Sequence, residues 1–556
     1  MLSSSLLRRW LNFPDRLLVL DFFYQWCATS LVVATPLGGR RNPGKQPRKQ
    51  AIYREENQVA QQPQPSKLPS LLKPINRAQR GCAAPEIQTV SVLLLSEDRQ
   101  TNIMRKKNGR RARKKRRKLE FRDTVVQSVT LSHEPQFVAL RRWLQQRGFS
   151  SKLLVPAHFS DTGRGLMTLE PIKAGALLIS LPEKCLLTTS TVLRSYIGEY
   201  MKRWKPPIAP LLALCTFLIS ERHFGQLAEW KPYIDVLPQK YTCPAYFSDE
   251  VIEVLPGNMR DKALEQRAKV QELQTSSLGF FSSLQPLFSQ PVDGVFTYDA
   301  LRWAWCSVNT RTVYMEHPPS PYLSMERNVY ALAPYLDLLN HCPAVQVEAG
   351  FSQGSYEIGS VQGCNRFQQA FICYGPHDNQ RLLLEYGFVA TGNPHSVVYV
   401  DQGVLWQCIS TTDRNQLAQK LLFLKNNDFL ENLTLSLDGP SWRLMTALRL
   451  LSLKLEQYHL WKSVLQGAVV SQDREEWCVE AALRICHNLI DDNARALDKI
   501  SQLTENADAS LTEQLAVVEH LQGEEQGILG FNLEVLQRLK NKFCHVHGTE
   551  YQTFPV

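Results

Sequence analysis

Three short stretches of the chain combine residue types that could bind a ligand or carry out a reaction. They are Thr162–Gly165 (TGRG), Leu332–His341 (LAPYLDLLNH) and Ala370–Val389 (AFICYGPHDNQRLLLEYGFV). A glycine-rich turn lets the backbone approach a ligand closely. An Asn-His pair after an apolar run is also typical of a satisfied core pair, and a single tyrosine is more often a core or interface residue than a catalytic one. The stretches therefore gain meaning only from their combination and order.

The glycine-rich turn does not fit a dinucleotide-binding motif. That motif needs a third glycine and a following helix within a βαβ unit. Here the residues after Gly165 predict a strand, and no second half of such a unit follows. We therefore interpret the turn as a place of close backbone approach and exclude a Rossmann-type site.

The elements around these stretches are predicted to be mixed. Apolar residues at helical spacing predict a helix over Val138–Gly148, which ends on a glycine. Residues 155–182 predict three strands separated by turns, the second strand covering 165–172 and the third 176–182. In the third stretch, residues 371–374 predict a strand and residues 379–385 a helical turn, and Tyr386-Gly387-Phe388 is expected to lead back to a strand.

Two further regions predict helices. Residues 205–290 form a helical insertion between the β segments, with helical periods in 210–223, 249–255 and 263–287, and Ala300–Arg311 is another amphipathic helix. In residues 401–556, a turn-like segment at 426–436 and a helix start at Asp438–Ser441 precede long amphipathic segments at 442–465, 475–503 and 511–540.

Charge is distributed unevenly along the chain. The 556 residues carry a formal net charge of +10, yet 11 of the basic residues lie within 105–118 (RKKNGRRARKKRRK), which holds no acidic residue. Residues 119–556 instead have a balance of about −8. A basic run of this density is typical of a nuclear-localisation signal or a nucleic-acid patch. The body of the chain is acidic, so we exclude a basic nucleic-acid-binding enzyme as its class.

The first 104 residues are expected to be a low-complexity, disordered extension. Residues 42–90 are rich in Pro, Gln, Lys and Arg and lack periodicity, which is typical of a linker. Residues 17–34 are apolar, but Asp21 and Gln25 interrupt them, and an Asp at a helix centre costs about 2.5–3.5 kcal/mol on insertion scales. We therefore expect no membrane segment.

The cysteine pattern indicates neither disulfides nor a metal site. None of the 13 cysteines forms a C-x-x-C pair, and many lie in apolar stretches, as small fillers do in a reducing compartment. The nearest approach to a metal motif is Cys544-His545-x-His547, whose spacing fits no common zinc template. We expect no structural metal.

Taken in order, the G-x-G turn, the Asn-His pair, the strand-ending Tyr-Gly and the Tyr-Gly-Phe resemble the SET-domain protein methyltransferases. The helical insertion, the missing cysteine-rich segment and the motifs WKPY, WAWCSVNTR, LAPYLDLLNH and FICYGPHDNQR are similar to the Rubisco large-subunit methyltransferase-like branch. The resemblance covers residues 130–540. It implies an α+β fold, with a β-rich, knot-like SET domain at 130–400 and an all-helical substrate-binding domain at 401–556.

The resemblance implies S-adenosylmethionine as cofactor. Gly163, Arg164 and Gly165 match the loop whose backbone lines the cofactor in the family. Arg311 matches an arginine near the methionine carboxylate, a partner that suits a guanidinium.

The remaining implied site residues come from the second and third stretches. Asn340 and His341 match the pair that holds the adenosyl and methionine portions of the cofactor. Tyr374 matches the catalytic tyrosine at the point of methyl transfer, where it also borders the cofactor. Tyr386 matches a second aromatic wall of the channel for the target lysine, and Phe388 is expected to line that channel as well.

The function implied is methyl transfer to lysine side chains of histone tails or non-histone proteins, by a monomer found in nucleus and cytoplasm. Residues 105–118 would bind the nuclear import machinery. A related branch methylates histidine, and channel dimensions decide between the two. Two other hypotheses stay open: a non-catalytic SET shell used only for interaction, and a nucleic-acid-binding protein built around 105–118.

Overall fold

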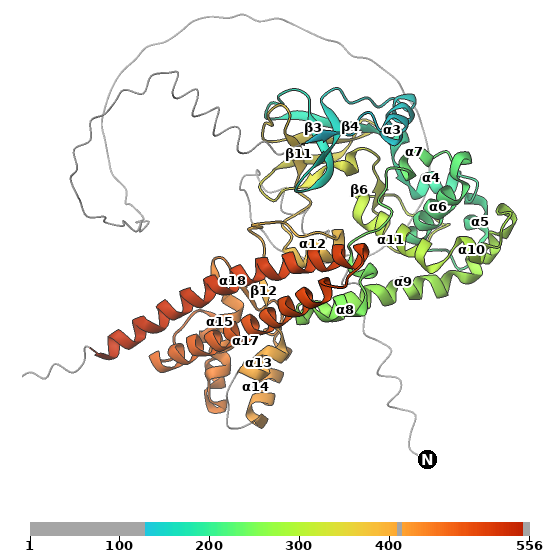
Figure 1. Ribbon diagram of the computed structural model, residues 1–556. Helices are drawn as coiled ribbons and strands as arrows, with labels where there is room; N and C mark the ends of the chain where they lie inside the picture. Colours follow the sequence, from blue (N-terminus) through green and yellow to red (C-terminus); the bar gives the residue numbers. More distant parts are fainter. Residues whose placement is uncertain (1–127, 409–413, 549–556) are drawn as a thin grey trace, which may run out of the picture. The chain divides into compact units, whose positions relative to one another are not determined.

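The computed structural model describes residues 128–408 and 414–548 (Figure 1). The extension at 1–104, the basic run at 105–118 and the apolar segment at 17–34 lie outside the described residues. Within the described ranges, no helix is both long and apolar enough to cross a membrane. The described chain is a mixture of strands and helices, as the sequence predicted, with helices dominating its C-terminal part.

Five strands from three separate parts of the sequence form the sheet that carries the candidate site. Its order is β1 (Val129–Thr130), β2 (Leu154–Phe159), β3 (Gly163–Thr168), β11 (Gln369–Ile372) and β8 (Asn340–His341). All neighbours are antiparallel except β11 and β8, which pair in parallel. Helix α3 (Pro135–Gln146) precedes β2 and is followed by Gly148 at φ +85°, which agrees with the predicted helix and its glycine end.

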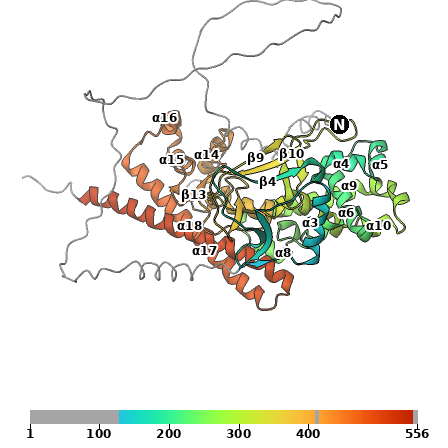
Figure 2. The same ribbon diagram turned by 90° about the horizontal axis from the view of Figure 1, so that it is seen from above.

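Three smaller sheets complete the strands. In chain order their members are β4 (Ala176–Pro182), β5 (Leu187–Thr188), β6 (Thr312–Tyr314), β7 (Tyr330–Leu332), β9 (Val347–Ser352), β10 (Ser355–Ser360), β12 (Val398–Tyr399), β13 (Thr434–Ser436) and β14 (Gly439–Pro440). The sheets run β4-β10-β9, β5-β7-β6 and β12-β13-β14. Figure 2 shows β4, β10 and β9 side by side. The predicted strand at 165–172 ends earlier than expected, at Thr168.

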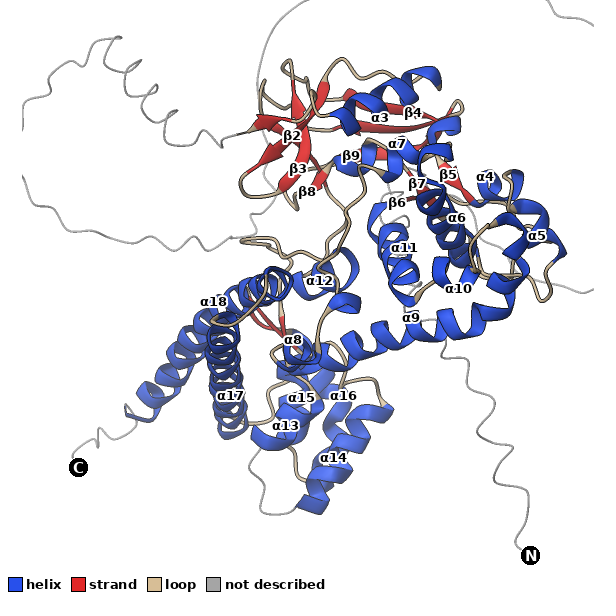
Figure 3. Ribbon diagram, turned by 45° about the vertical axis from the view of Figure 1, so that its right-hand side comes forward, coloured by secondary structure: helices blue, strands red, loops and turns tan. Residues whose placement is uncertain are grey.

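The predicted helical insertion is present between β5 and β6. It contains α4 (Thr189–Arg194), α5 (Gly198–Arg203), α6 (Pro210–Phe224), α7 (Lys231–Ile234), α8 (Asp249–Glu253), α9 (Gly257–Ser283), α10 (Val292–Val295) and α11 (Tyr298–Arg311). Three-residue 3₁₀ turns separate several of these helices. Figure 3 shows the long helix α9 passing beside α11 and α10. The periods predicted at 210–223, 249–255, 263–287 and 300–311 fall on α6, α8, α9 and α11.

The C-terminal region is helical, and it also contains the short strands β13 and β14. Its helices are α13 (Gln402–Cys408), α14 (Arg414–Asn426), α15 (Trp442–Ser452), α16 (Trp461–Leu465), α17 (Gln472–Thr504) and α18 (Ala509–Gly548). The predicted helix start at Asp438–Ser441 is confirmed, because the Ser441 hydroxyl caps α15 by accepting a hydrogen bond from the Leu444 N–H. The predicted segment 442–465 is not one helix, since α15 ends before the buried Leu453 and a 3₁₀ turn intervenes.

Three apolar cores stabilise these elements. The first packs strands and insertion helices between residues 131 and 370, and the second packs β12, β13 and helices α13–α18. The third joins α8 and the start of α9 to α12 (Asn379–Tyr386), α17 and α18, through residues such as Val251, Leu383 and Val518. The insertion and the C-terminal helices therefore share buried surface, and burial of this kind is the main favourable contribution to folding.

Candidate active site

The parallel pairing of β8 with β11 brings the second and third stretches together. Phe371 lies opposite Asn340, and Ile372 lies opposite His341. Two residues after Ile372, the Tyr374 N–H donates a hydrogen bond of 3.0 Å to the His341 Nδ1. The place where the knot-like crossing was expected is therefore a point of direct contact between these two segments.

Asn340 connects this contact to the glycine-rich turn. Its Nδ2 donates to the Arg164 carbonyl at 3.0 Å and to Gln369 Oε1 at 2.7 Å. A Cβ on Gly165 would lie 2.7 Å from Gln369 Oε1 and 3.0 Å from Asn340 Nδ2, so only glycine leaves room for the side chain of Asn340. Gly163, at φ +69°, has open space where a Cβ would be. The structure thus joins the turn and the Asn-His pair.

Three rings gather around Tyr374. Its ring centre lies 4.9 Å from that of Tyr386, 5.2 Å from that of His341 and 6.2 Å from that of Phe388. The hydroxyl of Tyr374 donates to the Leu339 carbonyl at 2.7 Å. Both lone pairs of that hydroxyl oxygen face away from this bond, and they can accept from another donor.

Burial shifts the titration of two of these groups. It raises the pKa of Tyr374 to about 12, against the lowering effect of the Arg311 charge. It lowers the pKa of His341 to about 4, with a smaller contribution from His395. At neutral pH, therefore, Tyr374 keeps its proton and His341 is a neutral imidazole whose Nδ1 accepts and whose Nε2 carries the hydrogen.

Helix α11 and the segment before β8 meet through a hydrogen bond between the Arg311 side chain and the main chain of Asp337. Arg311, at the last position of α11, donates from Nη1 to the Asp337 carbonyl at 2.8 Å. The Asp337 carboxylate accepts from the Tyr233 hydroxyl at 2.9 Å, and burial raises the pKa of Asp337 to about 6 although the Arg311 charge lowers it. The Arg164 side chain donates to the Val236 carbonyl at 2.7 Å, so Arg164 contributes its backbone to the turn and anchors its side chain in the insertion.

Three buried polar atoms without a partner lie at this place. Arg311 Nε, Asp337 Oδ1 and His341 Nε2 are buried and have no hydrogen-bond partner. An unpaired buried polar group costs about 1–3 kcal/mol, so such groups are rare and call for an explanation. The three atoms offer two donors and one acceptor, which a polar ligand could pair.

The structure brings every predicted site residue into this region, while their catalytic roles remain predictions. Gly163, Arg164 and Gly165 meet Asn340, and His341 meets Tyr374. Tyr386 is the last residue of α12, Phe388 lies two residues beyond it, and both rings lie beside that of Tyr374. One local prediction is wrong: the chain after Phe388 does not return to a strand, because Gly387 ends α12 in the left-handed conformation at φ +77° and residues 388–397 form turns and loop.

Sequence reasoning missed four neighbours of the site. Gln369 bridges Asn340 and Thr162, and His377 stacks on Tyr386 with ring centres 6.2 Å apart. The other two, Asp337 and Tyr233, pair with each other beside Arg311. A usable signal existed for Asp337, which is the one charged residue in LAPYLDLLN. Nothing in the sequence points to Gln369.

Among the residues described, no group of three or more His, Cys, Asp or Glu side chains could hold a metal ion. The side chains of Cys544, His545 and His547 lie outside the described part of the chain.

Comparison with known proteins shows which proteins this chain is similar to. The model of the "Rubisco LSMT substrate-binding" family matches residues 411–529. SET domain-containing protein 4 of Homo sapiens is 49% identical over 442 residues, which cover 79% of this chain and 100% of that protein. Actin-histidine N-methyltransferase of Homo sapiens is 27% identical and covers 50% of this chain and 46% of that protein.

A solved structure, that of Rubisco LSMT bound to AdoMet, covers 76% of this chain and 98% of its own, at 19% identity and a TM-score of 0.49. The identity of nearly one half over the full length of the human protein decides the family. The chain belongs to the SET domain-containing protein 4 family, in the Rubisco large-subunit methyltransferase-like branch of SET-domain proteins.

Proposed function

We propose that this protein transfers a methyl group from S-adenosylmethionine to lysine side chains of other proteins, with histones and non-histone proteins both in the candidate substrate class. The observation that carries the proposal is the group of three unpaired buried atoms on Arg311, Asp337 and His341, directly beside the ring cluster of Tyr374. Membership of a family of SET-domain proteins supports it.

The residues present fit S-adenosylmethionine. Its carboxylate could accept from Arg311 Nε, its ammonium could donate to Asp337 Oδ1, and a further acceptor could pair His341 Nε2. Asn340 would hold the glycine-rich turn against the cofactor through its bonds to Arg164 and Gln369. When bound, this cofactor supplies an activated methyl group on a cationic sulfonium.

The chain's own residues would prepare the amine. A lysine with a pKa of about 10.4 is only about 0.1% neutral near pH 7.4, an obstacle of about 4 kcal/mol. The rings of Tyr374, Tyr386 and Phe388 form a poorly hydrated wall, and desolvation lowers the pKa of an amine. The Tyr374 hydroxyl, whose proton is engaged by Leu339, would accept a hydrogen bond from the amine and orient it for in-line attack.

The pKa of about 12 argues against Tyr374 as the base. No carboxylate contacts its hydroxyl among the interactions of the described residues, so we expect the amine proton to pass to solvent. A lysine rather than a histidine target is part of the proposal. The actin-histidine enzyme among the relatives makes methylhistidine the competing product, and product analysis decides between the two.

Residues 105–118 belong to a second part of the proposal. With 11 basic residues in 14 positions they would bind the nuclear import machinery and place the protein in the nucleus as well as the cytoplasm. Deletion of 105–118 should shift the protein out of the nucleus and leave methyl transfer to a peptide unchanged. Loss of transfer in the deletion variant would contradict this division of roles.

The experiment that tests the enzyme activity uses the full chain with labelled S-adenosylmethionine, against histones and whole-cell lysate. Asn340→Ala and Tyr374→Phe are run beside the wild type, and cofactor binding is measured for each. We expect a labelled band with the wild type that is strongly reduced with both variants. A wild type that neither binds the cofactor nor labels any protein would favour the non-catalytic SET shell.

A further inference from the structure

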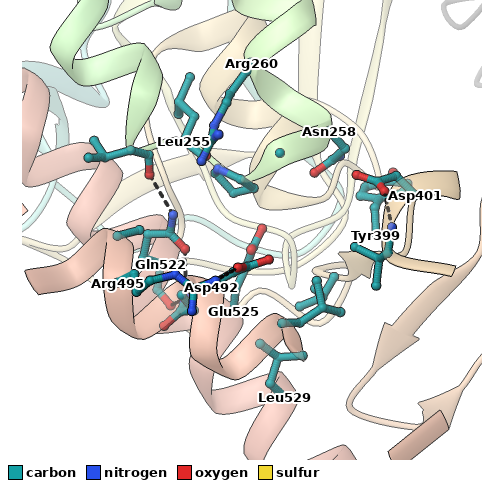
Figure 4. Close-up of a pocket in the computed structure, with 18 of the residues that line it drawn as sticks. Leu255, Asn258, Arg260, Tyr399, Asp401, Asp492, Arg495, Gln522, Glu525 and Leu529 are labelled. Atoms are coloured by element: carbon teal, nitrogen blue, oxygen red, sulfur yellow. Dashed lines mark hydrogen bonds and ion pairs between the residues drawn. The ribbon is translucent and has the colours of Figure 1, made fainter. Parts of the chain in front are cut away.

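A second candidate site lies in a cavity of about 340 Å³ whose lining includes none of the residues of the candidate active site. The end of α8, the start of α9, β12 and one face each of α17 and α18 line it. Figure 4 shows Glu525 and Gln522 of α18 below Asn258 and Arg260 of α9, with Tyr399 and Asp401 at one side.

The deep part of the cavity holds a carboxyl group that lacks a counter-ion. Glu525 is only 6% exposed, and its Oε1 accepts a hydrogen bond of 2.8 Å from Gln380 Nε2. No ion pair among the described residues includes Glu525, and no cation contributes to its titration. Since buried carboxylates are normally paired, this one stands out.

An independent observation at the same place is a second acceptor without a donor. Asn493 lines the cavity and is 5% exposed. Its Nδ2 donates to the carbonyl and the side-chain oxygen of Gln522, at 2.8 and 2.7 Å, whereas its Oδ1 is buried and has no partner. A ligand that brings hydrogen-bond donors would satisfy both Asn493 and Glu525.

The walls and the rim of the cavity define the rest of the ligand. Leu255, Val398 and Leu529 are buried apolar lining residues. At the exposed rim, Lys499 pairs with Glu253 at 2.5 Å and Arg495 pairs with Asp492, so these basic groups are already neutralised. Buried apolar lining residues beside an acidic group suit an alkyl chain that carries a cationic head.

We propose that this cavity binds a cationic head on an alkyl stem, namely a lysine or arginine side chain of the protein substrate at a distance from the methylated residue. The assignment to the substrate rests on the proposed methyl transfer, while binding of the cationic group does not. The match of residues 411–529 to a substrate-binding family model supports it, because that range contains Asn493, Gln522 and Glu525.

Binding should depend on pH in a defined direction. Burial raises the pKa of Glu525 to about 8, the hydrogen bond from Gln380 lowers it, and Asp378 at the start of α12 raises it. The other charged groups that line the cavity are Arg260 on α9, Asp401 before α13 and the ion pairs at the rim. None of them is among the causes of the raised pKa of Glu525. An acid with a raised pKa ionises only at higher pH, so a cation should bind more tightly as the pH rises from 6.5 to 8.5. At pH 6.5, binding of the cation should release the proton of Glu525.

The first test uses n-pentylammonium as the probe, with neutral n-pentanol as its matched partner, and isothermal titration of the full chain. We expect saturable binding of n-pentylammonium that strengthens from pH 6.5 to 8.5, and at least tenfold weaker binding of n-pentanol. Glu525→Gln, which keeps an acceptor for Gln380, should weaken n-pentylammonium binding at least tenfold, because it removes the charge. Glu519→Gln, an equal change of charge at an exposed position of α18, should not.

Equal binding of both probes, an unchanged affinity in Glu525→Gln, or no pH dependence would each overturn the proposal. The pH dependence in the wild type needs no variant, so the test holds even if Glu525→Gln fails to fold. For a labelled protein substrate, Glu525→Gln should raise KM at least tenfold with kcat within twofold. An unchanged KM overturns the assignment of the ligand to the protein substrate. Binding of n-pentylammonium without any methyl transfer overturns the proposed function, while the assignment of a cationic ligand to the cavity still holds.

Discussion

Replacement of Tyr374 by phenylalanine removes one oxygen atom from the centre of the site. The ring contacts with Tyr386 and His341 remain, because they depend on the ring alone. The hydrogen bond to the Leu339 carbonyl is lost, which should cost about 0.5–1.5 kcal/mol of the free energy of unfolding. The bond from the amine to the hydroxyl is also lost, and because that nitrogen gains positive charge as the methyl is transferred, the value for a hydrogen bond to a charged group applies, about 1.5–3 kcal/mol. Converted to a rate, this predicts that kcat falls roughly 10- to 150-fold.

The assay compares kcat for labelled methyl transfer, the Kd for S-adenosylmethionine and the thermal midpoint of Tyr374→Phe with those of the wild type. Tyr458→Phe is the matched control, because the Tyr458 hydroxyl also donates to a main-chain carbonyl, that of Leu450 at 3.2 Å, within the C-terminal helices. Both variants should lose similar stability and keep cofactor affinity, and only Tyr374→Phe should lose kcat. If Tyr374→Phe retained full kcat, the orienting role of its hydroxyl would be refuted.

Three further predictions concern the surroundings of this tyrosine. Gly375→Ala should destabilise the fold by roughly 1–3 kcal/mol in chemical denaturation, since Gly375 has φ +143° and an added Cβ would lie 2.5 Å from the His377 ring. The control Gly527→Ala, on α18 with open space where the Cβ would be, should be neutral or stabilising. The pKa of His341 of about 4 lies below the unfolded value of about 6.5, so the neutral ring's contribution to stability is complete above pH 6.5 and is lost as the pH falls toward 4. Histidine NMR should show a neutral His341 ring at pH 6, and a protonated ring at that pH would contradict this. Gly165→Ala should weaken S-adenosylmethionine binding roughly tenfold in calorimetry, the equivalent of one hydrogen bond, and an unchanged Kd would remove the turn from the cofactor site.

Local patterns in the sequence predicted those elements whose signals are local. The helix that ends just before Gly148, the insertion helices and the Ser441 cap all depend on periodicity or on a residue with one strong preference. The strand expected after Tyr386 failed because Gly387 packs against the backbone of Thr242 and Cys243, a contact between distant parts of the chain. The break at Leu453 has no glycine or proline to mark it, since tertiary burial of that leucine decides it.

The candidate site was predicted through its resemblance to a family, and the structure adds the contacts that a sequence does not contain. Parallel pairing of a two-residue strand with a four-residue strand, in which Asn340 faces Phe371 and His341 faces Ile372, is not visible in hydropathy. Gln369 and Tyr233 reach the site from separate elements and carry no distinctive local pattern. Only the three-dimensional arrangement shows that Asp337, within an apolar motif, pairs with Tyr233 and lies beside Arg311.

The central claim is that the site around Asn340 and Tyr374 methylates lysine in other proteins. The most direct measurement is mass spectrometry of proteins labelled by the full chain with deuterated S-adenosylmethionine, which locates the modified side chain. The account predicts deuterated methyllysine that forms at least about tenfold more slowly when Tyr374→Phe replaces the wild type. Deuterated methylhistidine, or methyllysine at equal levels with Tyr374→Phe, would contradict it.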